Sequence, residues 1–148
     1  MRAAIIVGFV IGITITNWLT DRVIPITDFH TEAINPVVMK GKSVYMETYL
    51  NRKRICNFVT ERTLYDSKNQ TLELNTKISI RPGPLGKDHN VHEIPIPNID
   101  TVSPGPAMIE NRVSWFCNPI HYIWPIQYTY RIKFYIVQAD NESVLSLS

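Results

Sequence analysis

The chain has 148 residues, of which 45% are hydrophobic and 19% are charged, with 15 Lys and Arg residues against 13 Asp and Glu residues. This composition is neither that of a disordered chain nor that of a polytopic membrane protein. The nearly balanced charge argues against a nucleic-acid-binding surface. The length suits one domain with a short appendage.

The N-terminal segment 3–19 carries no charge and is rich in Ala, Ile, Val and Gly. As a helix it rises about 26 Å, which approaches the hydrocarbon thickness of about 30 Å. Arg2 precedes the segment, and Trp18 lies at its far end, where an indole favours the membrane interface. We therefore expect residues 1–20 to form an uncleaved transmembrane anchor (a signal-anchor), with the N-terminus in the cytoplasm.

Three other interpretations of this segment stay open. A cleaved signal peptide needs small residues at its cleavage site, and residues 16–20 offer no good one. A buried core helix would be amphipathic, whereas this segment is apolar all round. In a virus particle, the segment could instead be an apolar arm buried against neighbouring subunits. Gly8 and Gly12 form a pair that can join helices of two copies, although chance explains so short a pattern more simply.

After residue 20 no segment shows a sustained helical period, whereas several alternate with period two, as strands do. Residues 40–42 and 66–70 have turn composition. Residues 81–90 and 98–106 contain Pro and Gly and are expected to be loops. The predicted strands are 43–51, 55–64, 71–80, 91–96, 107–117 and 126–139.

This pattern predicts an all-β fold, an antiparallel immunoglobulin-like β-sandwich preceded by one hydrophobic helix. The expected organisation is an anchor over 1–20, a linker over 21–32 that runs into a first strand, a sandwich over 33–139 and a flexible tail over 140–148.

The two cysteines, Cys56 and Cys117, lie in different predicted strands, each two residues from an aromatic side chain. Their spacing lacks the C-x-x-C pattern of zinc or thioredoxin-like sites. In an exported domain an oxidised pair is the usual state, so we expect one disulfide; two buried free thiols are the alternative. An immunoglobulin domain also has one disulfide beside an indole, although here Trp115 neighbours the second cysteine.

Two surfaces are candidates for binding. Aromatic residues concentrate near the C-terminal end of the domain, and Trp115, Tyr122, Trp124 and Tyr128 are the candidates for contact with a protein partner. They could equally close the end of the sandwich. The run Arg52, Lys53 and Arg54 predicts a basic patch for an acidic partner or lipid headgroups, or simply a solvated strand end.

No catalytic motif is present in the sequence: there is no G-x-S-x-G and no phosphate-binding glycine loop after a strand. We therefore expect a non-enzymatic protein without a cofactor. The alternative is an envelope protein that handles copper or zinc through His89, His92 and His121, although exposed loop histidines are the simpler interpretation of the first two.

Several features occur together: the hydrophobic N-terminus, residues 52–56, the Ser103-to-Pro106 loop, and Cys117-Asn118-Pro119 followed by Trp124-Pro125. In this combination the chain resembles small membrane-anchored β-sandwich proteins of unknown function from tailed bacteriophages. The resemblance implies a viral or bacterial origin and a binding or structural role. We expect a single-pass membrane protein with its sandwich on the periplasmic or extracellular side, or alternatively a virion component. It is expected to contact a protein partner, and a homo-oligomer is a further option.

Overall fold

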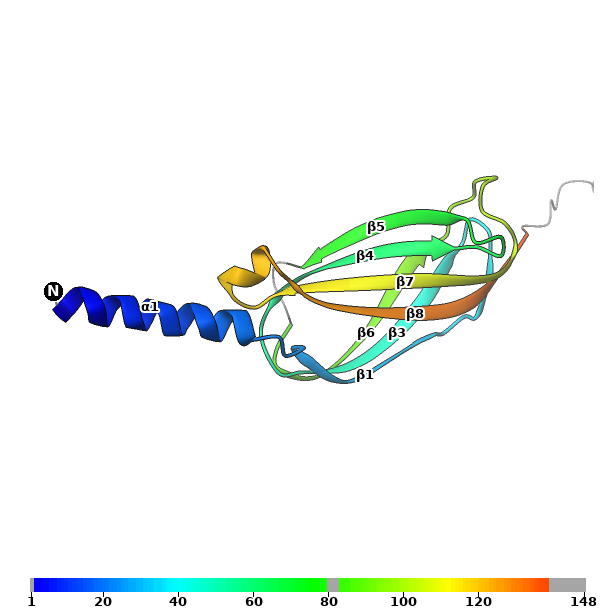
Figure 1. The fold of residues 1–148 in the computed structure, drawn as a ribbon. Helices are drawn as coiled ribbons and strands as arrows, with labels where there is room; N and C mark the ends of the chain where they lie inside the picture. The colour runs from blue at the N-terminus through cyan, green and yellow to red at the C-terminus, as the bar shows by residue number, and fades with distance from the viewer. Residues whose placement is uncertain (1, 80–82, 139–148) are drawn as a thin grey trace, which may run out of the picture.

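The computed structural model describes residues 2–79 and 83–138, and it contains one long helix followed by two β-sheets (Figure 1). This confirms the predicted β-sandwich-like fold with one N-terminal helix. The tail predicted over 140–148 lies outside the described residues. The elements are α1 (Arg2–Thr20), β1 (Ile26–Ala33), β2 (Val37–Met39), β3 (Ser43–Arg52), β4 (Asn57–Tyr65), β5 (Thr71–Ser79), β6 (Gly86–Pro95), β7 (Gly105–Phe116), the 3-10 turn η1 (Pro119–Tyr122) and β8 (Ile126–Val137).

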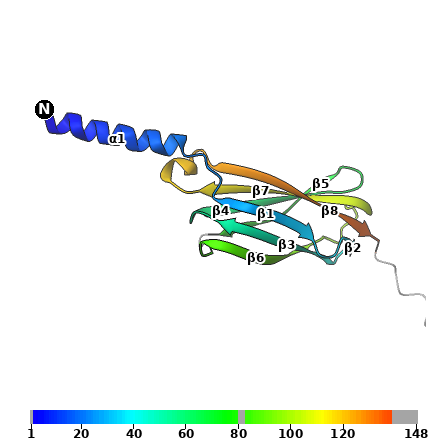
Figure 2. The ribbon, with the colours of Figure 1, turned by 90° about the horizontal axis from the view of Figure 1, so that it is seen from below.

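The strands form two layers. One sheet has the order β1-β3-β6 and the other the order β2-β8-β7-β4-β5. All described pairs are antiparallel except β2 with β8. Because β1 and β2 belong to different sheets, the chain changes sheet between them. Helix α1 leaves one end of the sandwich and points away from both layers (Figures 1 and 2).

Two strands extend beyond the ranges expected for them. β1 begins at Ile26, inside the expected linker 21–32, and a register shift between Thr27 and His30 interrupts its alternation. Asp28 in this bulge has a positive φ of 52°. β6 begins at Gly86, inside the expected loop 81–90. Its first inward residues are polar, so hydropathy shows no alternation there.

Both predicted turns are present. Gly41 has a φ of 85°, which a side-chain-bearing residue rarely adopts. In the second turn, the carboxylate of Asp66 accepts backbone N–H groups from Lys68, Gln70 and Ser103 at 2.8–2.9 Å. Burial raises the pKa of Asp66, but these donors outweigh burial and lower it overall. Asp66 therefore ties the β4–β5 turn to the loop before β7.

The interior of the sandwich has two parts. The half distant from the helix, here called the far half, is packed with aliphatic side chains and one phenylalanine. The half next to the helix, the near half, has a smaller core of Cys56, Val113, Trp115 and Ile126. The inner faces of the strands change character between these halves, as in β8, where Ile136, Phe134 and Ile132 give way to Tyr130 and Tyr128.

The predicted disulfide between Cys56 and Cys117 is confirmed. Asn57 pairs with Phe116, so the bridge lies at the ends of β4 and β7, two neighbouring strands of the same sheet. It joins adjacent strands and does not connect the two sheets, unlike the bridge of an immunoglobulin domain. It closes the near half at the end where the C-terminal end of helix α1 meets the sandwich (Figure 1).

Within the residues whose side chains the structure describes, no helix is both long and apolar enough to cross a membrane.

Candidate functional site: a polar and aromatic cavity between the sheets

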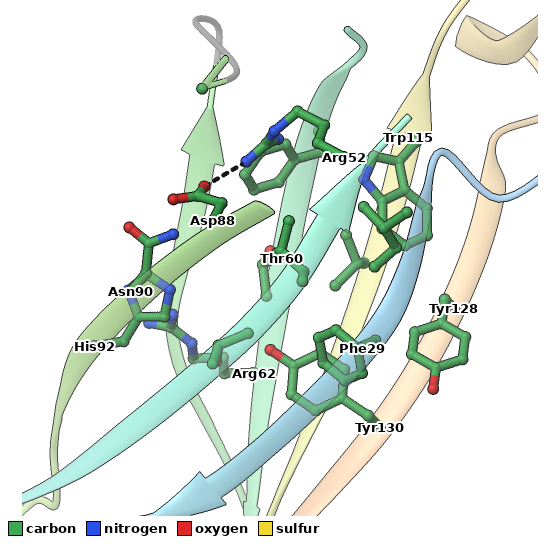
Figure 3. Close-up of a pocket in the computed structure, with 16 residues that line it drawn as sticks. Phe29, Arg52, Thr60, Arg62, Asp88, Asn90, His92, Trp115, Tyr128 and Tyr130 are labelled. Carbon is green, nitrogen blue, oxygen red and sulfur yellow. Dashed lines mark hydrogen bonds and ion pairs between the residues drawn. The ribbon is translucent and has the colours of Figure 1, made fainter. Parts of the chain in front are cut away.

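A cavity of about 220 Å³ lies between the two sheets in the near half (Figure 3). Facing sheets ordinarily fill this space with interdigitating apolar side chains. Here β3, β4 and β6 contribute polar residues, and β1, β4, β7 and β8 contribute aromatic residues. The polar lining comprises Thr48, Arg52, Thr60, Arg62, Asp88, Asn90 and His92, and the aromatic lining comprises Phe29, Phe58, Trp115, Tyr128 and Tyr130.

An ion pair lies at one side of the cavity, where Nη2 of Arg52 is 2.9 Å from Oδ2 of Asp88. Arg52 is 9% exposed, and no described group accepts a hydrogen bond from its Nε. Burial raises the pKa of Asp88, but hydrogen bonds from Asn90 and Arg52 outweigh burial and lower it overall. Asp88 is therefore a weak base that balances the charge of Arg52.

The second arginine of the cavity is Arg62 on β4. Its Nε donates to Oδ1 of Asn111 at 3.3 Å, and none of the ion pairs among the described residues includes it. Burial lowers its pKa from the ordinary value, but a guanidinium stays protonated at neutral pH. Burial also raises the pKa of the nearby Tyr130 to about 12, so this phenol remains neutral. The cavity thus carries a positive charge without a paired carboxylate.

Aromatic rings form another part of the lining, from β1 of one sheet and from β7 and β8 of the other. Phe29 lies edge-on to Tyr128 at 5.6 Å and is tilted against Tyr130 at 4.8 Å between ring centroids. Trp115 lies 6.4 Å from Tyr128. Figure 3 shows these labelled rings on the β1, β7 and β8 side and Asp88, Asn90 and His92 on β6. A flat apolar group fits this wall, because aromatic rings pack well in offset or edge-on arrangements.

The residues predicted as a basic patch do not form one. Arg52 faces inward and lines the cavity, whereas Lys53 is exposed. The guanidinium of Arg54 donates both Nη groups to the carboxylate of Asp21, at 2.6 and 2.7 Å, just beyond helix α1. Alternation along an extended chain sends consecutive side chains in different directions. β3 ends at Arg52 and Arg54 lies in a bend, so the chain turns here and the three adjacent cations occupy three environments.

The four aromatic residues predicted to contact a partner are divided between two places. Trp115 is only 4% exposed and Tyr128 is half-buried, and both line the cavity. Tyr122 and Trp124 are exposed by 66% and 56%, and Ile123 between them by 87%. Tyr122, Ile123 and Trp124, which we call the aromatic tip, follow β7 and lie beside the base of helix α1 (Figure 1).

Hydrogen bonds of Asn118 and His121 hold the aromatic tip in place. Asn118 caps η1 by accepting the backbone N–H groups of Ile120 and His121. His121 is fully buried: its Nδ1 accepts from the N–H of Cys117, and its Nε2 donates to the carbonyl of Asp21. Arg22 lies 4.2 Å from the ring centroid of Trp124 and donates to its carbonyl at 2.7 Å. The tip is therefore fixed to the base of the helix.

The three histidines of the metal hypothesis do not converge. His89 faces outward, stacked on Tyr49 and 2.7 Å from Glu47, whereas His92 lines the cavity from the other face of β6. His121 engages both ring nitrogens in hydrogen bonds at the helix base, which leaves no free nitrogen for a metal. Among the described residues no group of three His, Cys, Asp or Glu side chains could hold a metal ion.

Most of the cavity was not evident in the sequence. Arg62, Asp88 and Asn90 are polar, and two of them fall in a segment expected to be a loop. One signal was present: polar residues recur at every second position in Asp88, Asn90 and His92, and the aromatic alternation of Tyr128 and Tyr130 mirrors it. Pairing these two patterns across a sandwich requires the tertiary structure.

No protein-family model and no curated protein matches the chain. Among solved structures, the sporulation control protein Spo0M from Bacillus subtilis is similar, with a TM-score of 0.47 and 8% sequence identity. The likeness covers 79% of this chain and 51% of that one, so the chain spans about half the length of Spo0M.

Proposed function

We propose that this chain is a non-enzymatic binding protein held at a membrane by helix α1, with its disulfide-linked sandwich on the periplasmic or extracellular side. The observation that carries the proposal is the helix itself, which stands clear of the sandwich (Figure 2). Its described apolar side chains are exposed by 42–70%: Ile6, Val7, Phe9, Val10, Ile11, Ile13, Ile15 and Leu19. So large an apolar surface requires an apolar surrounding.

The aromatic tip supports a bilayer as that surrounding. Tyr122 and Trp124 combine an apolar ring with a polar edge, which is the character of residues in the aromatic belt of membrane proteins. They lie beside the base of helix α1, where Arg22 also stands over the Trp124 ring. In this proposal helix α1 lies in the apolar part of the bilayer and the aromatic tip lies at the membrane interface.

The disulfide supports a location of the sandwich on the periplasmic or extracellular side of the membrane, because such bonds persist mainly in oxidising compartments. The sandwich is then displayed outside the cytoplasm with the near half closest to the membrane. The resemblance to phage proteins adds the alternative that the same helix is buried among subunits of a virus particle.

We also propose that the sandwich is immunoglobulin-like. In support, the orders β1-β3-β6 and β8-β7-β4-β5 correspond to the A-B-E and G-F-C-C′ arrangements of that fold. The disulfide departs from that pattern, because it links the counterparts of strands C and F. Immunoglobulin-like domains commonly serve as recognition modules, and the cavity in the near half is the candidate recognition site here.

Single fluorescent labels test the membrane proposal. Both native cysteines are in the disulfide, so Gly12→Cys on helix α1, Ile123→Cys on the aromatic tip and Val91→Cys on the exposed face of β6 each provide one free thiol for an NBD label. The full chain is reconstituted into phosphatidylcholine vesicles. We expect doxyl lipids to quench the labels at 12 and 123, while aqueous iodide quenches the label at 91.

The outcomes separate the parts of the proposal. Quenching of the label at position 12 by iodide, as efficient as at position 91, contradicts the membrane anchor. Release of the protein by carbonate from expressing cells does the same and favours burial within an assembly. Lipid quenching at 12 without lipid quenching at 123 preserves the anchor and contradicts the interfacial role of the aromatic tip.

A further inference from the structure

The cavity in the near half contains two guanidinium groups but one carboxylate. Arg52 and Asp88 neutralise each other at 2.9 Å. The guanidinium of Arg62 has an amide oxygen 3.3 Å from its Nε, and no carboxylate of the described residues lies within 4.0 Å of it. With histidine neutral, the lining therefore has an excess of one positive charge.

Arg52 adds a second indication of a missing partner. Its side chain is nine-tenths buried and lines the cavity, yet its Nε donates to no described group. Buried donors are nearly always satisfied in native proteins, and an exception indicates a water, an ion or a ligand. A polar ligand atom in the cavity would satisfy this donor, and a ligand carboxylate would offset the charge of Arg62.

The rest of the lining determines what else the ligand must carry. Tyr128 and Tyr130 on β8 and Phe29 on β1 together present an aromatic part of the lining. Tyr130 is uncharged, because burial raises its pKa to about 12. The volume of about 220 Å³ is below the roughly 300–1,000 Å³ of pockets for drug-sized molecules. The space therefore suits a small molecule with a flat apolar body.

We propose that the cavity binds a small aromatic carboxylate, with its carboxylate against Arg62 and its ring against Phe29, Tyr128 and Tyr130. Arginine suits this task, because its planar donors match the two oxygens of a carboxylate. This inference rests on the proposal that the sandwich is a binding module, and it names the chemistry of what the module binds. The membrane anchor is a separate matter.

The test compares two probes that differ mainly in charge. The full chain in phosphatidylcholine nanodiscs is titrated with phenylacetate and, separately, with phenylacetamide, and binding is followed by tryptophan fluorescence and by the thermal midpoint. We expect saturable binding of phenylacetate and at least about tenfold weaker binding of phenylacetamide, the ratio that corresponds to about 1.4 kcal/mol. Equal binding of the two probes contradicts the proposed contact between the ligand carboxylate and Arg62.

Variants connect the binding to the cavity. Arg62→Met removes the unpaired charge and keeps a long side chain, and we expect about a tenfold loss of phenylacetate affinity. Arg112→Met is the matched control, because Arg112 is exposed on the outer face of β7, and its affinity should equal that of the wild type. Circular dichroism and the probe-free thermal midpoint verify that both variants fold. Should Arg62→Met fold and bind phenylacetate normally, the proposed site is wrong.

The label experiment and the probe experiment fail independently. Absence of saturable phenylacetate binding up to about 10 mM, equivalent to an affinity weaker than about 3 kcal/mol, contradicts the carboxylate site and leaves the membrane anchor standing. Phenylacetate binding by a chain whose helix label is accessible to iodide supports the site and contradicts the anchor.

Discussion

The two halves of the sandwich interior are built from the same strands but from different side chains. In the far half, Val44, Ile94 and Ile136 are at most 1% exposed and pack with other aliphatic residues. In the near half, the same strands β3, β6 and β8 continue inward with Arg52, Asp88 and Tyr128, which surround a cavity. The far half therefore accounts for much of the apolar burial that stabilises the fold. The near half has a smaller apolar core and contains the cavity.

The disulfide compensates for this difference, because it closes the half with the smaller apolar core. Replacing both Cys56 and Cys117 by Ala should lower the free energy of unfolding by about 4 kcal/mol, the chain-entropy value for a loop of this size. Urea unfolding with and without a reductant measures the loss. Hydrogen exchange should accelerate at Val113 and Ile126 more than at Ile109 and Ile136. Equal acceleration of hydrogen exchange in both halves would contradict the view that the disulfide stabilises the near half more than the far half.

A matched pair of valines measures how tightly each half is packed. Val44 is 1% exposed in the far half, and Val113 is 7% exposed and lines the cavity. Val44→Ala creates a new void and should cost about 2 kcal/mol, whereas Val113→Ala enlarges an existing space and should cost about 1 kcal/mol. Urea denaturation of both variants verifies the difference. A larger loss for Val113→Ala means that the near half is as tightly packed as the far half.

The far half also has a polar anchor, Asp66, whose carboxylate accepts three backbone N–H groups. Asp66→Asn should cost about 1.5 kcal/mol at neutral pH, the lower end for hydrogen bonds to a charged group. Because the pKa of Asp66 is lowered in the fold, its stabilisation is present above about pH 4 and is lost as the pH falls through the folded value. Urea midpoints of wild type and variant, taken from pH 6 to pH 2, should therefore converge in acid. A constant gap contradicts the ionised role.

Strands with apolar inner faces were predictable from the sequence. β3, β7 and β8 lie within two residues of their predicted ranges, because one side of each is apolar along part of its length. β6 was predicted only in part, since its inner residues Asp88 and Asn90 are polar and give no hydrophobic period. β1 was missed at its beginning because the bulge at Asp28 breaks the alternation. The failures fall where the chain builds the cavity.

The β-rich class and the apolar N-terminal helix were predictable without the structure, because hydrophobic period and composition are local properties of the chain. The disulfide was the expected state of two cysteines in an exported domain, and the structure confirms it. Which side chains meet became known only from the folded arrangement of the strands. In the structure Arg52, Trp115 and Tyr128 line the cavity. Tyr122 and Trp124 are exposed at the helix base. The physical reason is that strand pairing joins residues distant in sequence, whereas alternation gives only the face on which each one lies.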